Sequence, residues 1–145
     1  MGGAAVLRAI ARLDVRPDGI VVESTFDSLL TTVKHRFDRM PVPSTPLAEL
    51  LVFWGGWSAG IDGFDLDPCA DAAHVRCPAI VIHGDQDSFV TSSEARAIFD
   101  RLGAWKRYHE FAGARHCGAK TADPERWNRA LQELLGAAEE RDGVR

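Results

Sequence analysis

The sequence predicts an α/β fold, because short strand-like segments alternate along it with segments of helical periodicity. Two of these segments, residues 20–22 and 79–82, are continuous apolar runs, which is typical of strands covered on both faces of a parallel sheet. A third strand is expected over residues 106–111. The 145 residues fit one domain, residues 1–138, followed by a charged tail, residues 139–145, that we expect to fray.

The chain is expected to open with a helix over residues 2–13, whose apolar positions recur at helical spacing: Val6, Ile10 and Leu13. A turn at residues 17–19 ends this unit and leads into the first strand. Ser24 and Asp27 are spaced as a capping box, which predicts the start of a second helix directly after that strand.

Between residues 38 and 67 the periodicity breaks, because three prolines come close together and glycines follow a short helical stretch. We interpret residues 38–67 as a helical lid, an excursion from the core. Three aromatic residues within it, Trp54, Trp57 and Phe64, are expected either to line an apolar substrate pocket or to pack inside the lid.

The second half of the chain contains three signals for helix starts. Asp67 followed by proline predicts a short helix that ends near His74. Thr91 and Glu94 are spaced as a capping box for the next helix, and Asp123 followed by proline opens the last one. Helices therefore alternate with strands, the order that produces right-handed parallel crossovers and, here, a three-stranded parallel sheet flanked by helices.

Charge and composition exclude several classes of partner. Lys and Arg number 17 against 21 Asp and Glu, a net charge of −4 without a basic stripe, so we expect neither a nucleic acid nor a membrane as partner. Residues 50–61, the longest apolar stretch, fall short of the roughly 20 residues that span a bilayer. Three cysteines without metal-ligand spacing, and no secretory signal, favour a cytoplasmic protein: Cys69, Cys77 and Cys117.

Two segments carry the candidate chemistry. Asp85 and Asp87 come directly after the second strand, and His116 follows the third strand, 29 residues beyond Asp87. Because the carboxyl ends of parallel strands meet at one edge of a sheet, this spacing places Asp87 and His116 side by side. A carboxylate there can accept the Nδ1 proton of the imidazole, which leaves Nε2 free to act as a general base. Asp85 is interpreted as a turn residue, and the other histidines as surface or core residues: His35, His74, His83 and His109.

At these residues the chain resembles the α/β-hydrolase family, whose catalytic residues follow one another as nucleophile, acid and histidine. The segment HGDQDSFV matches the family pattern H-G-x-x-D-x-x-V, which makes Asp87 the acid, and the loop GARH makes His116 the base. The opening MGGA is similar to the back half of the nucleophile elbow G-x-S-x-G-G, cut directly after its serine. The resemblance covers the C-terminal half of that fold and implies hydrolysis of an ester, amide or similar acyl bond without metal or cofactor.

The chain departs from the family in one respect, because the nucleophile is absent. In the family the backbone N–H of the residue after the nucleophile helps to bind the oxyanion, a role that falls here on Met1. Loss of the nucleophile costs about a million-fold in turnover, so we expect the chain alone to be inactive. We expect the natural protein to begin upstream; an Asp as nucleophile would indicate dehalogenation, and a Cys lactone hydrolysis.

Two alternatives to this hypothesis remain open. In the first alternative the chain is a non-catalytic half-domain that associates with another chain through the exposed sheet edge from Ile20 to Val22. In the other alternative Ser24 or Ser58 replaces the missing nucleophile, although neither serine has the elbow's glycines on both sides.

Overall fold

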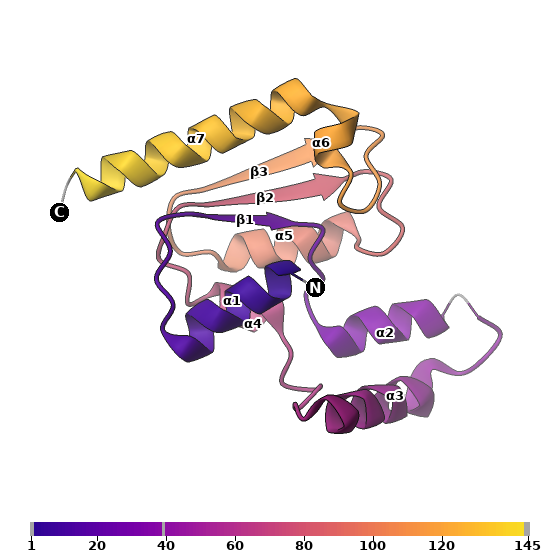
Figure 1. Ribbon diagram of the computed structural model, residues 1–145. Coiled ribbons are helices and arrows are strands. Elements are labelled where there is room, and N and C mark those ends of the chain that lie inside the picture. Colours follow the sequence, from indigo (N-terminus) through magenta and orange to yellow (C-terminus); the bar gives the residue numbers. More distant parts are fainter. Residues whose placement is uncertain (1, 39, 144–145) are drawn as a thin grey trace.

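The computed structural model describes residues 2–38 and 40–143, and Figure 1 shows its elements in a layered arrangement. In chain order they are α1 (Gly2–Leu13), β1 (Ile20–Glu23), α2 (Leu29–Phe37), α3 (Ser44–Ala59), α4 (Pro68–Ala72), β2 (Ala79–Gly84), α5 (Ser92–Arg101), β3 (Lys106–Phe111), α6 (Ala119–Ala122) and α7 (Pro124–Asp142). Met1, with its expected oxyanion role, lies outside the described residues.

The three strands form the predicted parallel sheet, in the order β1-β2-β3. Ile20 lies opposite Ala79, and Ala79 lies opposite Lys106, so all three strands enter the sheet in step. The fold class expected from the sequence is therefore confirmed. Because the strands are parallel and in step, the loops that leave β2 and β3 start from the same edge of the sheet.

The sheet separates two hydrophobic layers (Figure 1). Ile20 and Val22 pack with Leu7 and Ile98, so α1 and α5 cover one face together with α4. Val21, between those two strand residues, packs on the other face, where α6 and α7 lie. Side chains alternate between faces along a strand, and this alternation explains why the short strands are apolar throughout.

Three of the predicted helix starts are confirmed. Thr91 and Glu94 form a complete capping box, in which each side chain accepts from the other residue's backbone N–H. The carboxylates of Asp67 and Asp123 cap α4 and α7, and each helix has its proline in the first turn. These local interactions fix where the helices begin, independently of the packing around them.

The capping box expected at Ser24 and Asp27 is wrong. The helix α2 begins at Leu29, with Ser28 in the N-cap position. Ser24 instead adopts a left-handed backbone conformation, with φ of 48°, directly after β1. The side chain of Ser24 is buried and serves a contact distant in sequence, described below.

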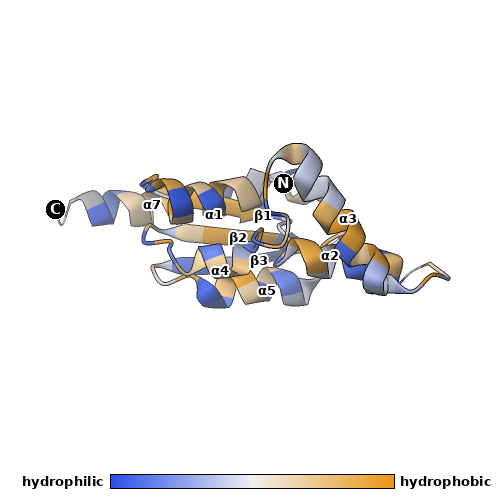
Figure 2. Cartoon of the chain, turned by 90° about the horizontal axis from the view of Figure 1, so that it is seen from below, coloured by the Kyte–Doolittle hydropathy of each residue, from blue (hydrophilic) through white to orange (hydrophobic). Residues whose placement is uncertain are grey.

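The segment 38–67 forms an excursion on one side of the sheet, built mainly by α3 (Figure 2). A salt bridge of 2.7 Å between Lys34 and Glu49 joins α3 to α2. Trp54 and Trp57 are 62% and 73% exposed, and Phe64 is also exposed. The expectation that these aromatic residues pack inside the lid is therefore wrong.

The last helix extends beyond its predicted end. Residues 139–142, where the sequence predicts a frayed tail, continue α7 to Asp142, and residues 144 and 145 lie outside the described part. Within residues 2–38 and 40–143, no helix is both long and apolar enough to cross a bilayer.

Candidate active site

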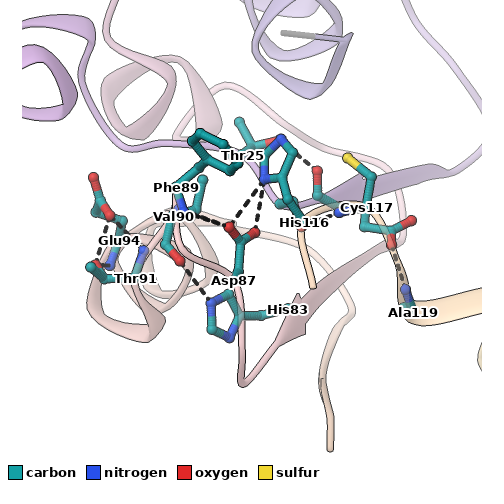
Figure 3. Close-up of polar contacts among 12 residues, drawn as sticks. Thr25, His83, Asp87, Phe89, Val90, Thr91, Glu94, His116, Cys117 and Ala119 are labelled. Carbon is teal, nitrogen blue, oxygen red and sulfur yellow. Dashed lines mark hydrogen bonds and ion pairs between the residues drawn. The ribbon is translucent and has the colours of Figure 1, made fainter. Parts of the chain in front are cut away.

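Asp87 and His116 face each other at the carboxyl ends of β2 and β3 (Figure 3). The Nδ1 atom of His116 lies 2.9 Å from Oδ2 and 3.1 Å from Oδ1 of Asp87. The Asp87 side chain is completely buried, whereas 36% of the His116 side chain is exposed. The structure therefore brings together the two side chains that the spacing placed at one edge of the sheet.

Backbone groups hold the Asp87 carboxylate in place. Its Oδ1 accepts the backbone N–H groups of Phe89 at 2.8 Å and Val90 at 3.1 Å, in the turn that follows β2. Burial alone would raise the pKa of Asp87, but these two N–H donors and the His116 imidazole outweigh it, and the pKa is lowered from its ordinary value. Asp87 is therefore an anion at neutral pH, oriented to receive the Nδ1–H of His116.

The loops after β2 and β3 are tied to each other. Asp85 accepts the backbone N–H of Gly113 at 2.7 Å, and the N–H of Gln86 donates to the carbonyl of Ala114 at 3.0 Å. A Cβ atom at Gly84 would collide with that same Ala114 carbonyl, so the close approach of the loops requires glycine there. Asp85 thus fixes the distance between the loops, in agreement with its interpretation as a turn residue.

His83 stabilises the turn that holds Asp87, a role that the sequence did not reveal. Its buried imidazole donates from Nε2 to the carbonyl of Val90 at 3.1 Å and so braces the turn that holds Asp87 (Figure 3). The other histidines lie elsewhere. His35 faces Glu94 at 3.7 Å, and His109 faces Glu133 at 3.5 Å.

Ser24 and Glu23 anchor the His116 loop to the end of β1. The Ser24 hydroxyl accepts the backbone N–H of Cys117 at 3.1 Å, and the Glu23 carboxylate accepts that of Ala119 at 3.2 Å. Burial raises the pKa of the Cys117 thiol, and the carboxylates of Glu23 and Asp87 raise it further. The thiol is therefore neutral at pH 7, which disfavours Cys117 as a nucleophile.

A cavity of about 510 Å³ opens beside His116. Its wall is mostly apolar and comes from the turn after β2, from α2 and from α3, including Phe26, Leu29, Val33, Phe37, Leu51 and Phe89. The ring of Phe89 contacts His116 edge-on, with ring centroids 5.1 Å apart, and Arg36 lies over Phe89. The cavity can hold an apolar group next to the imidazole.

Other residues that the sequence analysis considered for this site lie in different places. Trp54, Trp57 and Phe64 do not line the cavity, so the expectation of a pocket built from them is wrong. Ser58 is exposed on α3, where its hydroxyl donates to the carbonyl of Gly55. Ser24 does line the cavity together with His116.

The amino end of α1 begins beside the same loops (Figure 1). Gly3 approaches Thr25 so closely that a Cβ atom at Gly3 would collide with the Thr25 hydroxyl. Thr25 follows Ser24, which binds the residue after His116. The start of α1 therefore lies next to the segment that anchors the His116 loop.

Within the described ranges, no three His, Cys, Asp or Glu side chains converge as metal ligands. Asp62, Asp65 and Asp67, whose order does not fit a calcium loop, serve other purposes. Asp62 accepts the N–H of Phe64, Asp65 binds Arg8 and Arg12, and Asp67 caps α4.

Solved structures of three enzymes share this architecture. They are a thermophilic esterase from Thermogutta terrifontis, an enol-lactonase from Burkholderia xenovorans LB400 and an acylaminoacyl peptidase from Pyrococcus horikoshii. Each superposes on 94% of this chain, with TM-scores of 0.59, 0.60 and 0.65 and sequence identities of 16%, 19% and 17%, in that order. The chain spans 62% of the esterase, 63% of the lactonase and 23% of the peptidase.

No protein-family model matches the sequence, and no curated protein sequence matches it. At these identities the likeness concerns the fold. The chain adopts part of the α/β-hydrolase fold, as the resemblance at HGDQDSFV and GARH implied.

Proposed function

We propose that this chain supplies the acid and the histidine of a hydrolase that cleaves an ester, amide or similar acyl bond, with a nucleophile from a segment that precedes Met1. The contact between the buried, ionised Asp87 and Nδ1 of His116 carries the proposal. This arrangement fixes the imidazole tautomer and stabilises the imidazolium ion that forms when Nε2 takes up a proton.

In the proposed reaction, Nε2 of His116 removes the proton of the nucleophile as it attacks the acyl carbon. His116 then gives this proton to the departing alcohol or amine, and the acyl group stays on the nucleophile. Water releases the acyl group in a second step, with His116 again as the base. Asp87 stays ionised throughout and holds the charged imidazole.

The position of α1 supports a nucleophile that directly precedes this helix. In nucleophile elbows the reactive side chain stands between a strand and a helix, and the N–H after it helps to bind the oxyanion. Because α1 begins beside Thr25 and the His116 loop, a residue just before it would lie near the imidazole. Met1 would then supply the N–H of the oxyanion hole, and the 145-residue chain by itself would be inactive.

The cavity beside His116 supports the proposal that the substrate carries an apolar group. Its wall is mostly hydrophobic, and α3 contributes Leu51 to it. We propose that residues 38–67 act as the lid over this cavity. We also propose a cytoplasmic location, which the free thiols of Cys69, Cys77 and Cys117 favour.

The test begins with the codons directly upstream of Met1. We expect an in-frame G-x-S there, and the extended protein should hydrolyse p-nitrophenyl butyrate and react with a fluorophosphonate probe at that serine. In the extended protein, His116→Gln should lower kcat by at least about a thousand-fold, because the general base is lost. The matched control is His74→Gln, a histidine that does not line the cavity.

Two outcomes would overturn the proposal. A stop codon in frame next to Met1 would remove the upstream nucleophile. Fluorophosphonate labelling of the 145-residue chain at Ser24 would instead assign the nucleophile to a residue that already lines the cavity.

A second proposal rests on the open edge of the sheet. Among the described residues, β1 pairs with β2 and has no strand on its other side. An apolar groove runs along this part of the molecule, lined by Val6, Ile10, Ile20 and Val21 among others. If no nucleophile precedes the chain, we propose that it is a non-catalytic half-domain that pairs through β1 with another chain.

A further inference from the structure

A second cavity, of about 270 Å³, lies at the opposite end of the sheet from His116. Its lining includes Pro17, shortly before β1, and Cys77, shortly before β2, so it lies at the amino ends of the strands. Arg141 contributes from the carboxyl end of α7, which Figure 1 shows on the side away from the active-site loops.

Positive charge predominates in this cavity. Three arginines line it, Arg16, Arg76 and Arg141, against one carboxylate, that of Asp14. Arg16 already neutralises Asp14 through two hydrogen bonds of 3.0 Å. Among the side chains that the structure describes, a set that leaves out Asp142, neither Arg76 nor Arg141 forms an ion pair with a carboxylate.

Arg141 has an unsatisfied donor in this position. Its Nη1 atom is secluded from solvent and has no hydrogen-bond acceptor among the described residues. Arg76 uses its Nη1 atom on the backbone carbonyls of Ala73 and Val75. Arg141 is only partly buried and Arg76 is exposed, but enclosed polar atoms normally have a hydrogen-bond partner, and an anion would supply the acceptor that Nη1 of Arg141 lacks.

We propose that this cavity binds a small phosphate-bearing anion, held by Arg141 and Arg76. A guanidinium group presents two parallel N–H donors to phosphate oxygens, and the Nη1 donor of Arg141 would gain its acceptor. A cavity of about 270 Å³ has room for a phosphate group with a small organic substituent. The bound anion would join the end of α7 to the segment before β2. This site does not depend on the proposed hydrolase activity.

The experiment titrates the 145-residue chain with inorganic phosphate at constant ionic strength, by calorimetry and by thermal unfolding. We expect saturable binding and a Tm that rises with phosphate concentration. Arg141→Gln and Arg76→Gln should each weaken binding at least tenfold. The matched control is Arg129→Gln, which removes the same charge from the same helix about 18 Å away along its axis.

The binding data decide whether the cavity is a phosphate site. Non-saturable binding, or equal weakening by Arg129→Gln, would overturn it, because either result would reflect net charge alone. If Arg141→Gln fails to fold, as judged by circular dichroism, Arg76→Gln provides the same test. A parallel titration with glycerol 3-phosphate identifies the source of the anion. Tighter binding than inorganic phosphate assigns a phosphate ester, and equal binding assigns free phosphate.

Discussion

At the scale of single residues, Asp87 determines the electrostatics of the candidate site. Two backbone N–H groups and one imidazole surround a carboxylate that has no exposed surface. Charge-assisted hydrogen bonds of this kind lower the pKa of an acid even though burial opposes them. Asp87 therefore contributes to folding as well as to the orientation of His116.

The contribution of Asp87 to the free energy of unfolding depends on pH. The folded pKa of Asp87 lies below its unfolded value, so its stabilisation is complete above about pH 4 and is lost as the pH falls through the folded pKa. We expect Asp87→Asn to lower the free energy of unfolding by about 1–3 kcal/mol at pH 7. Urea unfolding should show this difference shrinking towards pH 2. A difference that stays constant with pH would contradict a lowered pKa.

The sequence was sufficient to bring Asp87 and His116 together, but not to assign Ser24. Both site residues follow recognisable strands, and parallel topology then determines where they meet. The pattern at Ser24 is local and suggests a helix cap, whereas its hydroxyl binds the N–H of a residue 93 positions away. The exposure of Trp54 could not be predicted either, because the sequence does not show whether another segment covers an apolar side chain.

At the scale of elements, the site depends on two loops that approach each other closely. The loops that follow β2 and β3 share hydrogen bonds through Asp85 and Gln86. Gly84 permits this approach, because its missing side chain leaves room for the carbonyl of Ala114. The distance between Asp87 and His116 therefore depends on a residue that touches neither.

Substitution at Gly84 tests this dependence. We expect Gly84→Ala to push the loops apart, to lower the free energy of unfolding by about 1–3 kcal/mol and to break the contact between Asp87 and His116. The NMR signal of the Nδ1 proton of His116 would report the loss of this hydrogen bond. Gly136→Ala is the control, since a Cβ atom there meets nothing within 4 Å, and it should stabilise α7 by up to about 1 kcal/mol. Equal effects of the two substitutions would rule out the proposed close approach.

At the scale of the whole molecule, the three-stranded sheet ends in β1 on one side and in β3 on the other, and among the described residues neither strand has a further strand beside it. At the β1 edge the backbone groups of Val21 and Glu23 face away from β2, because the N–H groups of Ile20 and Ser24 donate to the carbonyls of Pro78 and Ile82 on the β2 side. Both faces of the sheet are covered by helices, so another strand can add only at an edge such as β1. The chain spans less than two thirds of each of the three enzymes.

The unpaired edge of β1 predicts how the purified chain behaves. We expect the 145-residue form to elute from a size-exclusion column as a dimer or larger species, because unpaired strand edges associate. The upstream-extended form should elute as a monomer if its added segment covers β1. A cooperatively folding monomer of the short form would contradict an edge that requires a partner.

The hydrogen bonds that orient His116 all come from within the chain, from Asp87 through Nδ1 and from Ser24 and Glu23 through the backbone that follows. The contact between Asp87 and His116 is therefore formed by these residues themselves. Under the proposed function this suggests a catalyst in two pieces. A separate peptide that carries serine, cysteine or aspartate and docks along β1 would use the same Asp87–His116 pair, and the reaction would change with the peptide.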